Sequence, residues 1–179
     1  MPKWVRRVRI YPCAVLPAYR AATVTEMIIH FICRGNAFRS IIAEAYLDSL
    51  KLQNLKAMSS GTAAAVDRIR NRAAYAETLG LLAKHSIREF AKTEYGDQLT
   101  PSRLAGTDVA VCMNQRVYDE CQQLVSLPGT THTWSVADIG EPGRVVQTER
   151  GKALYREEAY QEIIEGVSQL VSEFHRAFG

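Results

Sequence analysis

The residues of this chain with the clearest capacity for chemistry are a cysteine and an arginine six positions apart, Cys33 and Arg39. The apolar residues 28–32 before them are typical of a buried strand, and residues 40–47 after them carry apolar side chains at helical spacing. A loop between a strand end and a helix N-terminus offers unpaired backbone N–H groups and the positive end of the helix dipole. The pattern therefore predicts an anion-binding loop that contains a nucleophilic thiol.

The other residues of this loop also suit a phosphate group. Arg39 presents a planar fork of donors that can hold two phosphate oxygens, and its charge stabilises a thiolate at Cys33. Gly35 lets the backbone approach a ligand, and Asn36 tolerates left-handed dihedrals and can brace the loop. Ser40 is suited to bond the thiolate or to cap the helix. An inert, buried cysteine is the alternative reading of Cys33. The predicted phosphate-binding residues are Arg34, Gly35, Asn36, Ala37, Phe38, Arg39 and Ser40.

This segment resembles the Cys-x-Gly-Asn-x-Cys-Arg-Ser signature of low-molecular-weight protein tyrosine phosphatases. Residues 39–45 are similar to the family's Arg-Ser-Pro-x-Ala-Glu-Ala continuation. Further likenesses follow in the family's order at residues 59–62 (Ser-Ser-Gly-Thr), 80–88, 108–113 and 138–142, the last where the family has its Asp-Pro acid loop. The resemblance covers about residues 27–178.

The chain departs from the family pattern at three places. Phe38 replaces the second loop cysteine, so the protective disulfide of many relatives cannot form. Glu141 replaces the aspartate before Pro142, and residues 143–144 (Gly-Arg) stand where the family has aromatic residues. Residues 63–65 are alanines where a tryptophan is usual, so we expect one wall of the cleft to be low.

The resemblance implies that Glu141 is the general acid that protonates the leaving oxygen. Asp138, three residues earlier, is the alternative donor, and both carboxylates could instead be solvated loop charges. The catalytic residues that we predict are therefore Cys33, Arg39 and Glu141.

The alternation of strand-like and helix-like segments predicts an α/β fold. We expect a four-stranded parallel sheet with helices on both faces and the phosphate-binding loop after the first strand. Cys33, Gly61 and the loop after Val136 should meet at the carboxyl edge of this sheet. The expected strands are residues 28–32, 56–59, 107–113 and 131–136, and the expected helices are residues 40–47, 67–79, 115–124 and 155–178.

Length and composition fit one enzyme domain, since the chain has 179 residues of which 47% are hydrophobic. Residues 1–26 contain five basic residues and one acidic residue, whereas the remainder is nearly neutral. We therefore expect a basic N-terminal extension over residues 1–26 and a phosphatase-like domain over residues 27–179, with an organelle transit peptide as the alternative for the extension. The prolines in residues 11–17 exclude a membrane span there.

The near-neutral body argues against nucleic-acid binding, and we predict no membrane partner either. The four cysteines lack metal-ligand spacing and suit neither a zinc site nor a secreted disulfide framework, so we predict no metal. A thiolate nucleophile favours a reducing compartment, which predicts a cytoplasmic protein. The oligomeric state is left open.

The resemblance implies a phosphomonoester hydrolase, a protein tyrosine phosphatase that forms a cysteinyl phosphate on Cys33. It needs no metal or organic cofactor, and its partner is a phosphorylated protein. One alternative is a thioredoxin-coupled arsenate reductase that uses Cys33 with Cys112 and Cys121, although core packing is the better account of the latter two. A phosphate-binding pseudophosphatase and a phosphoarginine substrate are further alternatives. The arginines at positions 68, 70 and 72 suit a solvated helix face that could attract an acidic phosphopeptide.

Overall fold

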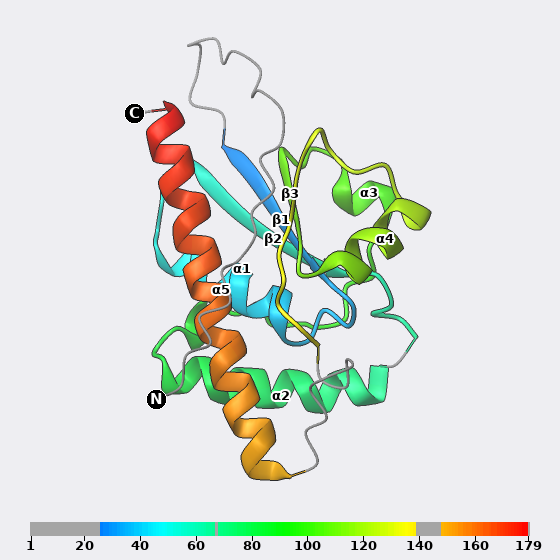
Figure 1. Ribbon diagram of the computed structural model, residues 1–179, viewed down its shortest axis with the longest axis vertical. Helices are drawn as coiled ribbons and strands as arrows, with labels where there is room; N and C mark the ends of the chain where they lie inside the picture. Colours follow the sequence, from blue (N-terminus) through cyan, green and yellow to red (C-terminus); the bar gives the residue numbers. More distant parts are fainter. Residues whose placement is uncertain (1–25, 67, 139–147, 179) are drawn as a thin grey trace.

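The computed structural model describes residues 26–66, 68–138 and 148–178 (Figure 1). Its first half contains β1 (Met27–Cys33), α1 (Arg39–Ser49), β2 (Leu55–Gly61), α2 (Arg68–Lys84) and a 3-10 turn, η1 (Arg88–Phe90). Its second half contains α3 (Pro101–Leu104), β3 (Val109–Cys112), α4 (Gln115–Leu124), β4 (Thr130–Thr133) and α5 (Glu149–Phe178).

The four strands form one parallel sheet in the order β2-β1-β3-β4. The predicted four-stranded parallel sheet is thereby confirmed. Cys33 at the end of β1 is in register with Gly61 at the end of β2, and Ile32 is in register with Cys112 of β3. Because parallel strands point the same way, these residues lie together at the carboxyl edge of the sheet.

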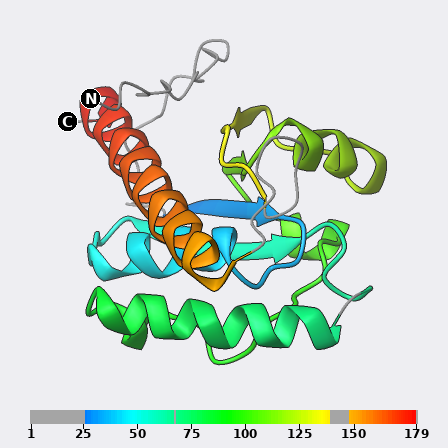
Figure 2. The ribbon, with the colours of Figure 1, turned by 60° about the horizontal axis from the view of Figure 1, so that its bottom comes forward.

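Helices cover both faces of the sheet, as predicted (Figure 2). On one face α1 and α5 pack on the strands with α2 outside α1, while α3 and α4 lie on the other face. Side chains alternate along β1, so Phe31 joins the core under α1 and α5, whereas Ile32 joins the core with Val117 of α4. Each such buried side chain contributes about 1.5–3 kcal/mol, and together they fix the strand ends that carry the loop.

Several element boundaries differ from the expectation. α2 continues through Gly80 to Lys84, because Leu82 in the next turn is fully buried and its packing outweighs the roughly 1 kcal/mol helix penalty of glycine. β4 ends at Thr133 instead of continuing to residue 136. α5 begins at Glu149, six residues before the expected start.

Two short elements, η1 and α3, were not expected from the sequence. The start of α3 carries a readable signal, because the Thr100 side chain accepts a hydrogen bond from Arg103 N and Pro101 occupies the first turn. Residues 1–25 lie outside the described residues, so the extension stays a prediction. Across the described helices, none is long and apolar enough to cross a membrane.

Candidate active site

The predicted loop joins the end of β1 to the start of α1 and borders a cleft of about 510 Å³. Cys33 is the last residue of β1 and Arg39 the first residue of α1, and both side chains are buried at the floor of the site. Six of the predicted site residues line the cleft: Cys33, Arg34, Gly35, Ala37, Phe38 and Arg39. Asn36 and Ser40 are fully buried and support the loop from behind.

The Cys33 thiol has two hydrogen-bonding neighbours. Asn36 N donates to Cys33 Sγ over 3.2 Å, and Ser40 Oγ lies 3.1 Å from the same sulfur. Asn36 Nδ2 donates to Ser40 Oγ over 3.1 Å, so the hydroxyl hydrogen of Ser40 is available to the sulfur. A thiolate at this position would therefore receive a backbone N–H and a hydroxyl as donors.

The Asn36 side chain stabilises the loop by hydrogen bonds to neighbouring segments. Its φ of +47° is a left-handed conformation that asparagine tolerates, as expected from the sequence. Its second amide hydrogen goes to Ser59 Oγ at 2.8 Å, and its Oδ1 accepts a hydrogen bond from Asp97 N at 3.0 Å. This buried side chain uses all of its amide groups, so it ties the loop to β2 and to the segment before α3.

A partly buried chain of polar side chains next to Asn36 was not predicted from the sequence. Ser59 Oγ donates to Glu44 Oε2 at 2.5 Å, and Lys92 Nζ lies 3.6 Å from the same carboxylate oxygen and 2.8 Å from Asp97 Oδ2. Burial raises the pKa of Glu44, and the charge of Lys92 and the Ser59 hydrogen bond oppose that rise. The sequence feature that could have indicated these polar contacts is Glu44 itself, an acidic residue between the apolar residues 41–43 and 45.

Gly61 of β2 is required by close packing against the loop. A Cβ atom at this residue would lie 2.6 Å from Arg34 O and 2.7 Å from Asn36 N, so no side chain fits. The next two backbone N–H groups, of Thr62 and Ala63, donate to the carbonyls of Cys33 and Arg34 at 3.0 and 2.9 Å. The turn that follows β2 therefore holds the first half of the loop through its backbone.

Arg39 is held by the segment that follows β4. Its Nη1 donates to Val136 O at 2.9 Å, and its Nη2 donates to Asp138 Oδ2 at 2.6 Å. Tyr155 of α5 fixes the same segment, because its hydroxyl donates to Ala137 O at 2.6 Å. Asp138 lines the cleft. Glu141, the predicted general acid, lies outside the described residues.

Phe38 also lines the cleft, at the place where the family signature has its second cysteine. Its ring lies 6.2 Å from the ring of Tyr155, measured between centroids. An aromatic ring thus borders the thiol pocket from within the loop itself.

The two other cysteines that the structure describes lie on the far side of the sheet from the thiol pocket. Cys112 and Cys121 are fully buried with Ile32 in the core under α3 and α4, whereas Cys33 belongs to the core on the α1 side. Their sulfurs are 3.9 Å apart. The hydrogen bond with Cys121 and burial raise the pKa of Cys112, so it stays a thiol.

His30 of β1 and His85, the residue that follows α2, make structural contacts. His30 is fully buried, its Nε2 lies 2.8 Å from Ser60 Oγ, and burial, with the charges of Lys92 and Arg103, lowers its pKa to about 4. His85 stacks on Tyr160 away from the loop. In the part of the chain that the structure describes, no group of three or more His, Cys, Asp or Glu residues could hold a metal ion.

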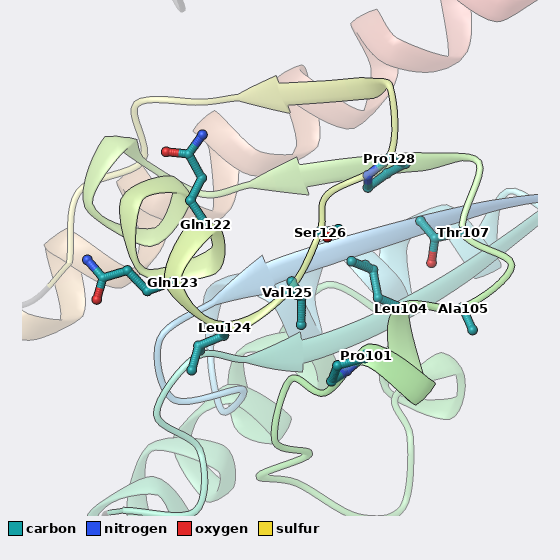
Figure 3. Close-up of a pocket in the computed structure, with 10 residues that line it drawn as sticks. All are labelled: Pro101, Leu104, Ala105, Thr107, Gln122, Gln123, Leu124, Val125, Ser126 and Pro128. Atoms are coloured by element: carbon teal, nitrogen blue, oxygen red, sulfur yellow. The ribbon is translucent and has the colours of Figure 1, made fainter.

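A second pocket, of about 650 Å³, lies between α3 and the end of α4 (Figure 3). Its lining contains no acidic or basic side chain and no cysteine or histidine. The hydroxyls of Thr107 and Ser126 have no acid or base in this lining to activate them, so the cleft at Cys33 is the candidate active site.

The fold and this loop define a class of cysteine-based phosphatases. The family model described as low molecular weight phosphotyrosine protein phosphatase matches residues 28–177, and the chain belongs to this family. No curated protein matches the chain significantly.

Solved structures share the fold at low sequence identity. Wzb from Vibrio vulnificus, in complex with benzylphosphonate, is 23% identical with a TM-score of 0.64, over 82% of this chain and 98% of its own. A thioredoxin-dependent arsenate reductase from Corynebacterium glutamicum is 18% identical with a TM-score of 0.59, over 86% of this chain and 64% of its own. The YwlE arginine phosphatase from Geobacillus stearothermophilus is 18% identical with a TM-score of 0.54, over 86% of this chain and 98% of its own. Two of these structures thus carry different named activities on one fold, arsenate reductase and arginine phosphatase.

Proposed function

We propose that this chain is a protein tyrosine phosphatase that works through a cysteinyl phosphate on Cys33. The main support is the surroundings of Cys33 Sγ, which has the Asn36 N–H and the Ser40 hydroxyl within 3.2 Å and shares one cleft with Arg39. These donors would stabilise a thiolate that faces a bound phosphate.

In the proposed reaction, the Cys33 thiolate attacks phosphorus in line, a sulfur–phosphorus bond forms, and the bond to the leaving oxygen breaks. The guanidinium of Arg39 and the loop's backbone N–H groups other than that of Asn36, which donates to Cys33 Sγ, hold the equatorial oxygens, where negative charge concentrates. Water then attacks the cysteinyl phosphate, and the thiolate leaves with its electron pair as phosphate is released. The carboxylate that protonated the leaving oxygen takes the proton from this water.

We assign two different roles to the carboxylates of the acid loop. Glu141 holds the position of the family's acid before Pro142 and is the proposed proton donor. Asp138 accepts a hydrogen bond from Arg39, so one of its carboxylate oxygens is already engaged by the guanidinium. We therefore propose that Asp138 positions the Arg39 guanidinium.

Two observations favour an aryl phosphate over arsenate chemistry. Phe38 gives the cleft an aromatic border next to Cys33, which suits a ring-bearing substrate. Cys112 and Cys121 face the opposite core, so they support a packing role and not a thiol relay with Cys33. Since a thiolate nucleophile is preserved in a reducing environment, we propose the cytoplasm as the place of action.

The test is a side-by-side assay of the purified protein on a phosphotyrosine peptide, a phosphoarginine peptide, and arsenate with thioredoxin. We expect the highest kcat/KM on phosphotyrosine, with loss of that activity in Cys33→Ser and its retention in Cys112→Ser. A higher kcat/KM on phosphoarginine would contradict the proposal and indicate an arginine phosphatase. Thioredoxin-dependent arsenate turnover would contradict it and indicate an arsenate reductase. Phosphate binding without turnover of any substrate would identify a pseudophosphatase.

A further inference from the structure

Basic side chains from several elements gather at the cleft. Besides Arg39, five basic residues line it, and among its lining residues only Glu77 and Asp138 are acidic. The basic residues come from the loop and from α2, α4 and α5, of which α2 and α4 lie on different sides of the loop after β1 (Figure 1). The five are Arg34, Arg70, Arg116, Lys152 and Arg156. The fold thus collects them from distant parts of the chain.

On one side of the cleft, two guanidinium groups form ion pairs with a single carboxylate. Arg34 Nε and Arg116 Nε lie 3.3 and 3.1 Å from the same oxygen, Glu120 Oε1. Thr62 Oγ1 donates to the other oxygen of Glu120. The Arg34 and Arg116 side chains are 46% and 57% exposed and that of Glu120 is 26% exposed, so one carboxylate pairs with two cations that line the cleft. This side keeps an excess of positive charge toward a ligand.

The α2 side of the cleft is low and carries one basic and one acidic residue, Arg70 and Glu77, of which Glu77 forms an ion pair with Arg156 of α5. Ala63, Ala73 and Ala74 line it where bulky side chains are absent, and Arg70 is the basic residue of α2 that lines it. Arg72, two residues further along α2, is also exposed but does not line the cleft. Contact with a substrate beyond the phosphate would therefore be set on this side by a guanidinium and small methyl groups.

We infer that the substrate is an acidic phosphopeptide segment, with Asp or Glu residues beside the phosphorylated tyrosine, and that Arg70 and Arg116 determine this specificity. The inference rests on the proposed function, because it names the sequence context of the same phosphoryl group. A peptide with basic neighbours would meet like charges from three helices. Each exposed charge pair should change kcat/KM by roughly two- to fivefold, and several pairs together by about tenfold.

The test uses phosphotyrosine peptides that are identical except for Glu or Lys residues flanking the tyrosine. The readout is the ratio of kcat/KM between the acidic and the basic peptide, in which a general loss of activity cancels. We expect a ratio of about ten at low ionic strength and a fall toward one at roughly 0.5 M salt, because exposed charges are screened. Arg70→Ala should lower the ratio through KM, and Arg70→Glu should lower it further. Arg72→Ala is the matched control and should leave it unchanged.

A wild-type ratio near one at low salt, or an equal effect of Arg72→Ala and Arg70→Ala, would overturn the specificity assignment. If both peptides are hydrolysed equally, the phosphatase proposal stands and only this inference fails. If neither phosphotyrosine peptide is hydrolysed, the proposed function fails with it.

Discussion

Asp138 accepts a hydrogen bond from Arg39 at 2.6 Å, although the two residues are 99 positions apart in the chain. The Arg39 side chain is almost fully buried, whereas that of Asp138 is 38% exposed and borders the cleft. The carboxylate therefore fixes one end of the guanidinium that we propose as the phosphate clamp, and it does so from the acid loop. Changes in that loop should affect phosphate binding as well as proton transfer.

The two acid-loop carboxylates should respond differently to the leaving group. A nitrophenolate departs without a proton more readily than a tyrosine phenolate, whose pKa is about 10. Glu141→Gln should lower phosphotyrosine turnover by roughly two orders of magnitude and nitrophenyl phosphate turnover less. Asp138→Asn should mainly weaken binding of phosphate, by a similar factor for both substrates. A leaving-group-dependent loss in Asp138→Asn alone would make Asp138 the proton donor.

Cys33→Ser should abolish turnover and still bind phosphate or vanadate, because the loop amides and Arg39 remain in place. Arg39→Lys should lose both rate and anion affinity, since a lysine cannot bind two phosphate oxygens as a planar fork does. Steady-state kinetics and calorimetric titration with vanadate measure the two effects. Hydrolysis at the wild-type rate by Cys33→Ser would end the assignment of this nucleophile.

Replacing both Cys112 and Cys121 with alanine should lower stability by roughly 1 to 2 kcal/mol, since both thiols fill the core under α3 and α4. Aryl phosphate hydrolysis per folded molecule should stay close to wild type, because this core lies on the other face of the sheet from Cys33. Urea unfolding and a kinetic assay on the same preparation separate the two quantities. Loss of activity without loss of stability would show that the pair takes part in the reaction.

Peroxide should inactivate the protein irreversibly. Phe38 stands where relatives have a second loop thiol, so a sulfenic acid at Cys33 has no neighbouring cysteine in the loop to form a protective disulfide. Further oxidation to the sulfinic acid is not reversed by dithiothreitol. Phe38→Cys is the comparison variant and should recover more of its activity after reduction. Complete recovery of the wild type after strong peroxide treatment would contradict this prediction.

Stability should fall in mild acid through His30. Its pKa in the folded protein is about 4 against an ordinary 6.5, so the unfolded chain takes up a proton at higher pH than the folded one. The stabilisation is complete above about pH 6.5 and declines by roughly 2 to 3 kcal/mol as the pH falls toward 4. The difference in urea unfolding free energy between wild type and His30→Gln isolates this contribution. A pH profile that is the same in both proteins would exclude His30 as its source.

The amino-acid sequence by itself determined the four strands, the four longer helices and the loop. Local periodicity is visible in a linear pattern, so the alternation of strands and helices and the position of the Cys33 loop between them could be predicted. The left-handed conformation of Asn36 was also readable, because few residue types besides asparagine and glycine tolerate it. The left-handed conformations of Lys51 and Ser86 were not predicted, since these residue types do not favour that region. The lengths of β4 and α5 were less accurate, since element ends depend on packing as well as on propensity.

Tertiary structure alone decided which distant residues meet at the loop. The sequence placed Asp138 near the carboxyl edge of the sheet, but not on Arg39, and it gave no sign that Glu44 reaches Asn36 through Ser59. Nor did it show that basic residues of three helices share one cleft. Such contacts depend on strand register and on the way helices cross the sheet, and a one-residue change of register in β2 would turn Ser59 to the opposite face.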